Sequence, residues 1–212
     1  MDAAETALVL ENRRGYEFVK RVIDIVGSTV LLMLFSPIAA LIGLLVKLDS
    51  PGSVMFKQVR VGRYGRKFII YKFRTMCQDA EHLQKQMEKY NEAGGAYFKM
   101  TNDPRVTRVG AILRKLSLDE IPQFINVLIG DMSLVGPRPL PITGYEEEDW
   151  YKFKCLVPPG MTGLWQISGR SELSGEQAAD LDVEYVKRRS TWLDLKILFG
   201  TVPAVLRRKG AA

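Results

Sequence analysis

The chain has 212 residues, enough for one ordinary hydrophobic core with some length left for an appended segment. Its formal net charge of +6 favours an acidic partner, such as an anionic lipid, a nucleic acid or a phosphorylated substrate. Two distant cysteines, Cys77 and Cys155, and a single histidine, His82, argue against a zinc site, a disulfide scaffold and a Ser-His-Asp triad. Any chemistry must therefore rest on carboxylates, arginines and lysines, with or without a hard metal ion.

An uncharged apolar run extends from Ile25 to Val46. At roughly 1.5 Å per residue in a helix, it is just long enough to cross a bilayer. It is too long for a cleaved signal peptide, and one small domain could hardly bury a helix of this length that is apolar on every side. We therefore expect this segment to enter the membrane.

Basic residues flank the apolar run on both sides, and positive charge favours the cytoplasmic face of a membrane. Pro37 removes a helical hydrogen bond and bends the helix, while the Ser36 hydroxyl can satisfy the freed carbonyl. The residues alone leave two topologies open. The helix either breaks at Ser36-Pro37 and returns to the same leaflet, or spans the bilayer with a proline kink.

The rest of the chain has the pattern of one mixed α/β domain that is mostly helical. Residues 53–62 and 67–76 are rich in β-branched and aromatic side chains and predict a small β-hairpin around a Gly62–Gly65 turn. The segments that follow are a polar helix at 78–92, a Gly94-Gly95 loop, a turn at Asp103-Pro104 leading into a short helix, a helix from Ser117 to the glycine Gly130, a proline-rich loop at 136–144, an acidic helix at 146–154, a loop at 157–170 and a helical region from 175 to 208.

Two adjacent carboxylates, Asp119 and Glu120, stand at the start of the expected helix that begins at Ser117. Ser117 and Glu120 match the S-x-x-E capping box, in which the glutamate reaches back to the serine amide. In that interpretation Asp119 merely suits the positive end of the helix dipole.

The surroundings of the two carboxylates also permit catalysis. Arg114 lies about one turn upstream, and Arg138 is held between two prolines in a loop whose backbone is restricted. Arginine recognises phosphate with two-point geometry, and a helix N-terminus binds phosphate through its free amides. Two carboxylates among arginines suit a Mg²⁺ diphosphate site, with one carboxylate attacking phosphorus and the other on the metal. Residue types leave both interpretations open.

Several stretches, in order along the chain, resemble the bacterial sugar transferase family, the monotopic phosphoglycosyl transferases that begin lipid-linked glycan assembly. The resemblance covers roughly Lys20 to Leu198 and is more specific than any single motif. The matching stretches are KRVIDIVGS, the Ser36-Pro37 pair, VGRYGRKFIIYKFRTM, NDPRVTRVGAILRKLSLDEIPQFINVLIGDMSLVGPRP, PPGMTGLWQISGR and LDVEYV with STWLDLKIL.

The resemblance implies transfer of a sugar phosphate from a nucleotide sugar, usually a UDP-sugar, to a polyprenyl phosphate with Mg²⁺ and release of the nucleoside monophosphate. It implies that Asp119 is the nucleophile of a covalent phosphosugar–aspartate intermediate, and that Glu120 is a Mg²⁺ ligand or proton acceptor. Both carboxylates are expected to contact the metal. The substrate-binding residues that it implies are Lys72, Arg74, Arg114, Pro137, Arg138, Pro139, Gln166, Arg170 and Asp194.

The resemblance also implies the domain organisation. We expect an N-terminal lead at 1–19, a re-entrant membrane helix at 20–50 broken at Ser36-Pro37, and a catalytic domain at 51–212 on the cytoplasmic face of a bacterial inner membrane. Longer members of the family carry further N-terminal spans and a regulatory domain, so the chain would be a minimal catalytic form or a fragment. The stretch GLWQISGR is closer to members that use glucose or galactose than to those that use N-acetylated amino sugars, and a homodimer is left open.

The main alternative is a membrane-anchored basic protein that binds anionic lipid or nucleic acid without catalysis. Nucleic-acid binding predicts a basic stripe with interleaved aromatic residues or a recognisable reading motif. The basic residues here instead gather beside the apolar run and around the carboxylates, so no nucleic-acid partner is expected. A membrane phosphatase with an aspartyl intermediate would differ only in using water as the acceptor.

Overall fold

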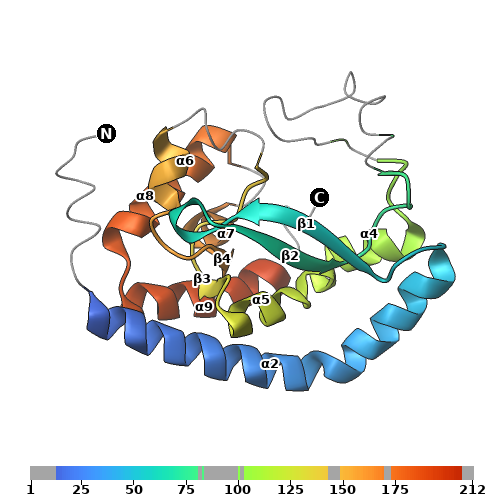
Figure 1. The fold of residues 1–212 in the computed structure, drawn as a ribbon, viewed down its shortest axis with the longest axis horizontal. Helices are drawn as coiled ribbons and strands as arrows, with labels where there is room; N and C mark the ends of the chain where they lie inside the picture. The colour runs from blue at the N-terminus through green and yellow to red at the C-terminus, as the bar shows by residue number, and fades with distance from the viewer. Residues whose placement is uncertain are drawn as a thin grey trace.

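One long helix, α2 (Arg14–Asp49), runs beneath the other elements and bends upward in its second half towards the β-hairpin (Figure 1). The protein is seen here as a computed structural model that describes residues 13–80, 83, 100, 103–142, 149–169 and 173–206. Its other elements are β1 (Met55–Val61), η1 (Arg63–Gly65), β2 (Lys67–Phe73), α4 (Arg108–Lys115), η3 (Leu118–Glu120), α5 (Gln123–Ile129), β3 (Ser133–Val135), α6 (Asp149–Lys154), β4 (Gly160–Thr162), α7 (Leu164–Ser168), α8 (Gly175–Arg188) and α9 (Thr191–Leu206). The expectation of a mostly helical α/β domain is confirmed.

The expected break at Ser36-Pro37 is absent, because α2 continues through Pro37 as one helix. Proline has no N–H, so the carbonyl of Met33, four residues earlier, loses its helical donor. The Ser36 hydroxyl donates to that same carbonyl at 2.9 Å, as predicted. The acceptor that proline would leave unpaired is thereby satisfied without unwinding the helix.

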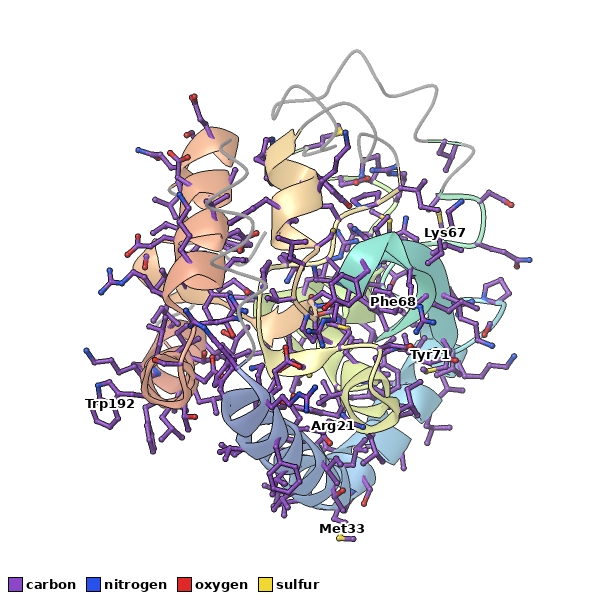
Figure 2. All side chains as sticks on the ribbon, turned by 60° about the vertical axis from the view of Figure 1, so that its left-hand side comes forward. Arg21, Met33, Lys67, Phe68, Tyr71 and Trp192 are labelled. Carbon is purple, nitrogen blue, oxygen red and sulfur yellow. The ribbon has the colours of Figure 1, made fainter. Side chains whose placement is uncertain are left out.

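α2 has one face against the domain and one face that nothing in the described residues covers. On the inner face, buried Asp24 accepts hydrogen bonds from the Ser133 hydroxyl and the Leu134 amide, both at 2.9 Å. On the outer face, Met33 is 71% exposed and Leu34 is 65% exposed, and Figure 2 shows Met33 pointing away from the other elements. Of the described helices, α2 alone is long and apolar enough to cross a membrane.

The two strands of the predicted hairpin pair as expected, and a buried asparagine joins them to α5. β1 and β2 are antiparallel, with Val59 opposite Ile69. Asn126 of α5 donates from its side-chain amide to the Ile69 carbonyl at 2.7 Å and accepts from the Tyr71 amide at 3.1 Å. Its side chain thus occupies the place of a neighbouring strand, which fixes β2 against α5.

A second, unpredicted pair of strands positions the proline-rich loop. β3 and β4 run parallel, with Val135 opposite Thr162. A Cβ atom on Gly160 would overlap the backbone of Gly136, so this close approach requires glycine. The main core lies between these strands, β2 and the helices, and consists of Phe68, Ile70, Val127, Met132, Leu134, Val135, Phe153, Val157, Tyr185, Val186 and Ile197.

Other predicted elements are confirmed in part. The helix expected from Ser117 to Gly130 is divided into η3 and α5, and Gly130 ends α5 in the left-handed conformation, with φ of 98°. The helical region expected from 175 to 208 is divided into α8 and α9. The features that lie outside the described residues are most of the 78–92 helix including His82, the Gly94-Gly95 loop, residues 143–148, Arg170 and residues 207–208.

The bond between α5 and β2 generates a stability prediction. Asn126→Leu keeps the size of the side chain but leaves the Ile69 carbonyl and the Tyr71 amide of β2 without partners. We expect a loss of about 2–5 kcal/mol in the free energy of unfolding, because two main-chain groups become unsatisfied. Ile125→Ala on the exposed side of the same helix is the control. Equal losses for the two variants in denaturant titration would contradict the prediction.

Candidate active site

Ser117 does not form the capping box that its spacing to Glu120 predicts. Its φ of 55° is in the left-handed region, and its side chain makes no cap hydrogen bond. The Ser117 amide donates instead to the Arg114 carbonyl at 3.0 Å, so this residue terminates α4. A helix N-cap needs an extended backbone, which Ser117 cannot adopt at the same time. The capping-box prediction is therefore wrong, and Glu120 is available for other partners.

Glu120 is the meeting point of three segments. Its Oε1 atom accepts from Lys72 Nζ of β2 at 2.8 Å and from Arg138 Nη2 of the loop after β3 at 2.9 Å. Phe73, next to Lys72, and Ile121, next to Glu120, belong to the same buried cluster. Packing of these apolar neighbours brings the charged residues together, and all three lie in the set predicted from the sequence.

Asp119 is 8% exposed and lies among the same charges. The cations of Lys72, Arg114 and Arg138 act on its carboxyl group electrostatically, as does the negative charge of Glu120. Yet no hydrogen bond or ion pair to the Asp119 carboxylate is present among the described residues. A buried carboxylate that no neighbour engages directly is suited to bond formation with a substrate.

The pKa values of the two adjacent carboxyl groups are shifted in opposite directions. Burial is the largest influence on Asp119 and raises its pKa, assisted by the charge of Glu120 and opposed by the three cations. Burial would also raise the pKa of Glu120, but the charges of Arg138 and Lys72 and the hydrogen bonds that they donate hold that pKa well below its ordinary value. Glu120 is thus the permanently ionised member of the pair.

Arg114 is held in place by a residue that the sequence analysis missed. Its Nε atom donates to Thr75 Oγ1 at 2.9 Å, just beyond the end of β2. The Thr75 carbonyl also accepts from the Thr107 amide at 3.0 Å, and this bond joins Thr75 to the start of α4. Thr75 lies in the KFRTM stretch, but nothing in residue type or spacing indicates that it supports an arginine.

The loop that carries Arg138 is fixed on both sides. Pro137 is fully buried, and its carbonyl accepts from the Gly160 amide at 2.9 Å. The Pro139 carbonyl accepts from Arg60 Nη1 of β1 at 3.2 Å. Both prolines therefore act on the shape of the loop, as their restricted backbones predict.

Three residues predicted to bind substrate have other contacts in the structure. Arg74 is buried and donates to the carbonyls at the end of α2 and just beyond it, those of Val46, Ser50 and Pro51. A cation there suits the negative end of the helix dipole, and Arg74 is not brought to the carboxylates. Gln166 donates to the Met161 carbonyl at 2.9 Å within the β4–α7 region.

Asp194 belongs to a separate buried network at the base of α2. It accepts from Lys20 Nζ at 2.9 Å, from the Tyr185 hydroxyl at 2.7 Å and from the Tyr16 hydroxyl at 3.0 Å. The same Lys20 also donates to the Val135 carbonyl at 2.8 Å. Asp194 is thus engaged by protein groups, whereas Arg170 lies outside the described residues.

The carboxylate pair fits a magnesium ion in number and type of donor. Mg²⁺ prefers oxygen ligands and is usually held by one or two carboxylates, with water and substrate phosphate completing its shell. Asp119 is unengaged, and the hydrogen bonds to Glu120 all reach its Oε1 atom. Among the described residues, no group of three or more acidic, cysteine or histidine side chains could hold a metal. Phosphate and water would have to supply the remaining ligands.

Comparison with known proteins places this geometry in context. The family described as bacterial sugar transferase matches residues 15–208. The chain is 43% identical over 194 residues to the galactosyl transferase CpsE of Streptococcus agalactiae, covering 91% of this chain and 43% of that protein. It is 42% identical over 204 residues to the undecaprenyl-phosphate galactose phosphotransferase of Salmonella typhimurium, with 94% and 43% covered.

A relative of similar length is also found. The exopolysaccharide production protein ExoY of Rhizobium meliloti is 44% identical over 197 residues, covering 91% of this chain and 87% of that protein. The chain therefore spans less than half the length of the first two relatives and most of the third.

The opposite pKa shifts predict opposite effects on stability. Glu120→Gln removes the charge that Lys72 and Arg138 share and should lower the free energy of unfolding by about 1.5–3 kcal/mol, the range for hydrogen bonds to charged groups. Asp119→Asn removes a charge that burial disfavours and should raise the thermal midpoint at pH 7.

The comparison is made by thermal unfolding without nucleotide sugar. The gain from Asp119→Asn should vanish as the pH falls through the raised pKa of Asp119, because the wild-type group is then neutral as well. The support from Glu120 should persist to lower pH, because its pKa is depressed. A lowered midpoint for Asp119→Asn at pH 7 would show that burial does not dominate at this carboxylate.

Proposed function

This chain belongs to the bacterial sugar transferase family, and on that premise we propose that it transfers a sugar 1-phosphate from a UDP-sugar to a polyprenyl phosphate and releases UMP. The reaction would be the first membrane step in assembling a glycoconjugate such as an exopolysaccharide. The observation that carries the proposal is the unengaged, buried carboxylate of Asp119 among three cations. Two of the relatives are named for galactose transfer, so UDP-galactose is the first donor to test.

In the proposed first step, an Asp119 oxygen attacks the phosphorus atom that bears the sugar. A bond from Asp119 to phosphorus forms, the bond to the bridging oxygen breaks, and UMP departs with that oxygen and the electron pair. In the second step an oxygen of the polyprenyl phosphate attacks the same phosphorus and releases the aspartate carboxylate. Burial favours the attack, because it disfavours the free carboxylate charge that bond formation removes.

The cations and Glu120 have different proposed roles. Lys72, Arg114 and Arg138 would offset the negative charge of the diphosphate and of the departing UMP. An efficient general base has a pKa near the working pH, whereas that of Glu120 is held far below it. We therefore assign Glu120 to holding Lys72, Arg138 and the metal in place, and not to accepting a proton.

The proposed cofactor is Mg²⁺, held by Asp119 and Glu120. When bound, it would neutralise phosphate charge and orient the diphosphate for in-line displacement. Asp119 and Glu120 would supply the negative charge of this site, and Arg114 and Arg138 would supply the positive charge.

We propose that α2 is re-entrant, with the domain on the cytoplasmic face of the inner membrane. Near its start, Lys20 bonds to Val135 and Asp194, and near its end the Asp49 carboxylate accepts from the Val109 amide at 3.1 Å. Both ends are therefore attached to the same domain, which supports a topology in which they lie on one side of the bilayer. The exposed apolar outer face of the helix would lie in one leaflet. The basic flanks favour the cytoplasmic side.

The covalent step generates a direct prediction. Wild-type protein given UDP-galactose and Mg²⁺ without lipid should release at most about one UMP per enzyme and gain the mass of a sugar phosphate, as a covalent two-step mechanism requires. The added mass should map to the peptide that contains Asp119 and be absent from Asp119→Asn. Asp131→Asn, on the loop after α5, is the control and should react like wild type.

The same assay separates the alternatives. Continued UMP release without lipid would indicate a phosphatase, and no release with any UDP-sugar would indicate a binding protein. Turnover by Asp119→Asn with polyprenyl phosphate would exclude this aspartate as the nucleophile.

The topology generates a second prediction. In a background without Cys77 and Cys155, single cysteines at the exposed positions Arg14 and Lys57 should show the same accessibility to a membrane-impermeant thiol reagent in vesicles. A cysteine at Met33 should be protected until detergent is added, because that position would lie among lipid chains. Opposite accessibility of the two flanks would show that the helix spans the bilayer.

A further inference from the structure

A buried ion pair lies directly behind the loop that carries Arg138. Lys154, the last residue of α6, and Asp182, in the middle of α8, are 4% and 3% exposed. Lys154 Nζ lies 3.2 Å from Asp182 Oδ2. The ammonium group also lies over the rings of Trp150 and Tyr151, at 5.3 and 5.2 Å from their centres.

Both members of this pair lie against the backbone of one residue. Lys154 Nζ donates to the Arg138 carbonyl at 2.8 Å. Burial raises the pKa of the Asp182 carboxyl group to about 6, and the nearby Arg138 backbone N–H is among the groups that oppose this rise. The cation therefore holds the carbonyl of residue 138, and the anion lies near its amide.

The flanking prolines limit how the backbone beside residue 138 can be held. Pro137 and Pro139 have no N–H, so the backbone on either side of Arg138 offers only acceptors. The carbonyls of these prolines are bonded to Gly160 and Arg60, but neither bond reaches residue 138 itself. The ion pair thus supplies a donor to the Arg138 carbonyl, which the flanking prolines cannot do because they have no N–H.

Stability alone does not account for such a pair. Removing two charges from water is costly, and well-packed apolar residues in the same place would often stabilise a protein as much. One oxygen of Asp182, Oδ1, makes no hydrogen bond among the described residues, so the pair is not fully satisfied. Its most specific contacts are those with Arg138.

We infer that Lys154 and Asp182 are positioning residues, which hold the backbone of Arg138 so that its guanidinium group is preset on Glu120. The inference deepens the proposed function, in which Arg138 binds the phosphates of the donor. It concerns geometry and not charge at the reacting atoms. The ammonium group of Lys154 contacts the Arg138 carbonyl, Asp182 and the two aromatic rings.

The first test measures the bond between Arg138 and Glu120 and needs no activity. In the wild-type background, the losses of thermal midpoint from Arg138→Ala and Glu120→Gln should be non-additive, because both variants remove the same bond. In the Lys154→Met background the two losses should become additive, because the bond is already weakened. Coupling that persists unchanged in Lys154→Met would overturn the inference, whether or not the protein is a transferase.

The second test uses the transfer reaction. Lys154→Met should lower kcat/KM about tenfold or more when Arg138 is present, and by less than about twofold in the Arg138→Ala background. A residue that only stabilises the fold would lower kcat/KM by the same factor in both backgrounds. That result would overturn the inference while leaving the proposed function standing.

Arg105→Met is the matched control. Arg105 is 3% exposed and forms an ion pair with Asp103, with 2.6 Å between Nη2 and Oδ2, and in the described part of the chain this pair does not contact the loop that carries Arg138. It should lower the thermal midpoint but leave the coupling between Arg138 and Glu120 intact. If Lys154→Met does not fold, Asp182→Asn carries the same two cycles, since it removes the charge partner with a change of similar size. Loss of the coupling in the Arg105→Met control would also count against the inference.

Discussion

The candidate site depends on one carboxylate oxygen that two cations share. Glu120 Oε1 lies 2.8 Å from Lys72 Nζ and 2.9 Å from Arg138 Nη2, and the three residues come from a strand, a short helical turn and a loop. Without the carboxylate between them, the positive charges of Lys72 and Arg138 would repel each other. The negative charge therefore joins three segments and, at the same time, keeps positive charge concentrated beside Asp119.

The adjacent carboxylates illustrate how environment separates chemical roles. Asp119 and Glu120 are neighbours in sequence and differ by one methylene, yet the pKa of one is raised and that of the other lowered. Burial acts to raise both pKa values, but only Glu120 also accepts hydrogen bonds from Lys72 and Arg138, and these bonds together with the two charges outweigh burial there. Pairs of carboxyl groups whose pKa values are driven apart are typical of sites where one group reacts and the other holds charge. The proposed nucleophile and the proposed metal ligand follow this division.

The apolar helix and the candidate site form one mechanical unit. Lys20 and Asp24 of α2 bond to residues of β3, and the loop with Arg138 begins where β3 ends. At the other end of the helix, Arg74 donates to the Val46 carbonyl of α2. The next residue along the chain, Thr75, accepts from Arg114 and supports it. In the proposed reaction the acceptor is a membrane lipid. A short path from the exposed apolar helix to the two arginines proposed to bind phosphate suits that acceptor.

The sequence by itself determined the features that depend on neighbouring residues. The hairpin, the glycine end of α5 and the Ser36 bond to the carbonyl freed by Pro37 were predicted correctly, because each involves groups a few residues apart. Local pattern and family resemblance together also indicated Lys72, Asp119, Glu120 and Arg138 as one site.

Only the tertiary structure decided which polar groups meet across the chain. The S-x-x-E pattern at Ser117 predicted a cap, but the end of α4 had already fixed the backbone of that serine. Arg74 and Asp194 were predicted to lie beside the substrate. In the structure Arg74 bonds to the end of α2, and Asp194 bonds to Lys20, which is 174 residues away in the sequence. Lys154 and Asp182 gave no signal, because a buried ion pair is specified by packing between helices. Residue spacing records contacts within a turn or a hairpin, and these bonds form only when the core brings distant segments together.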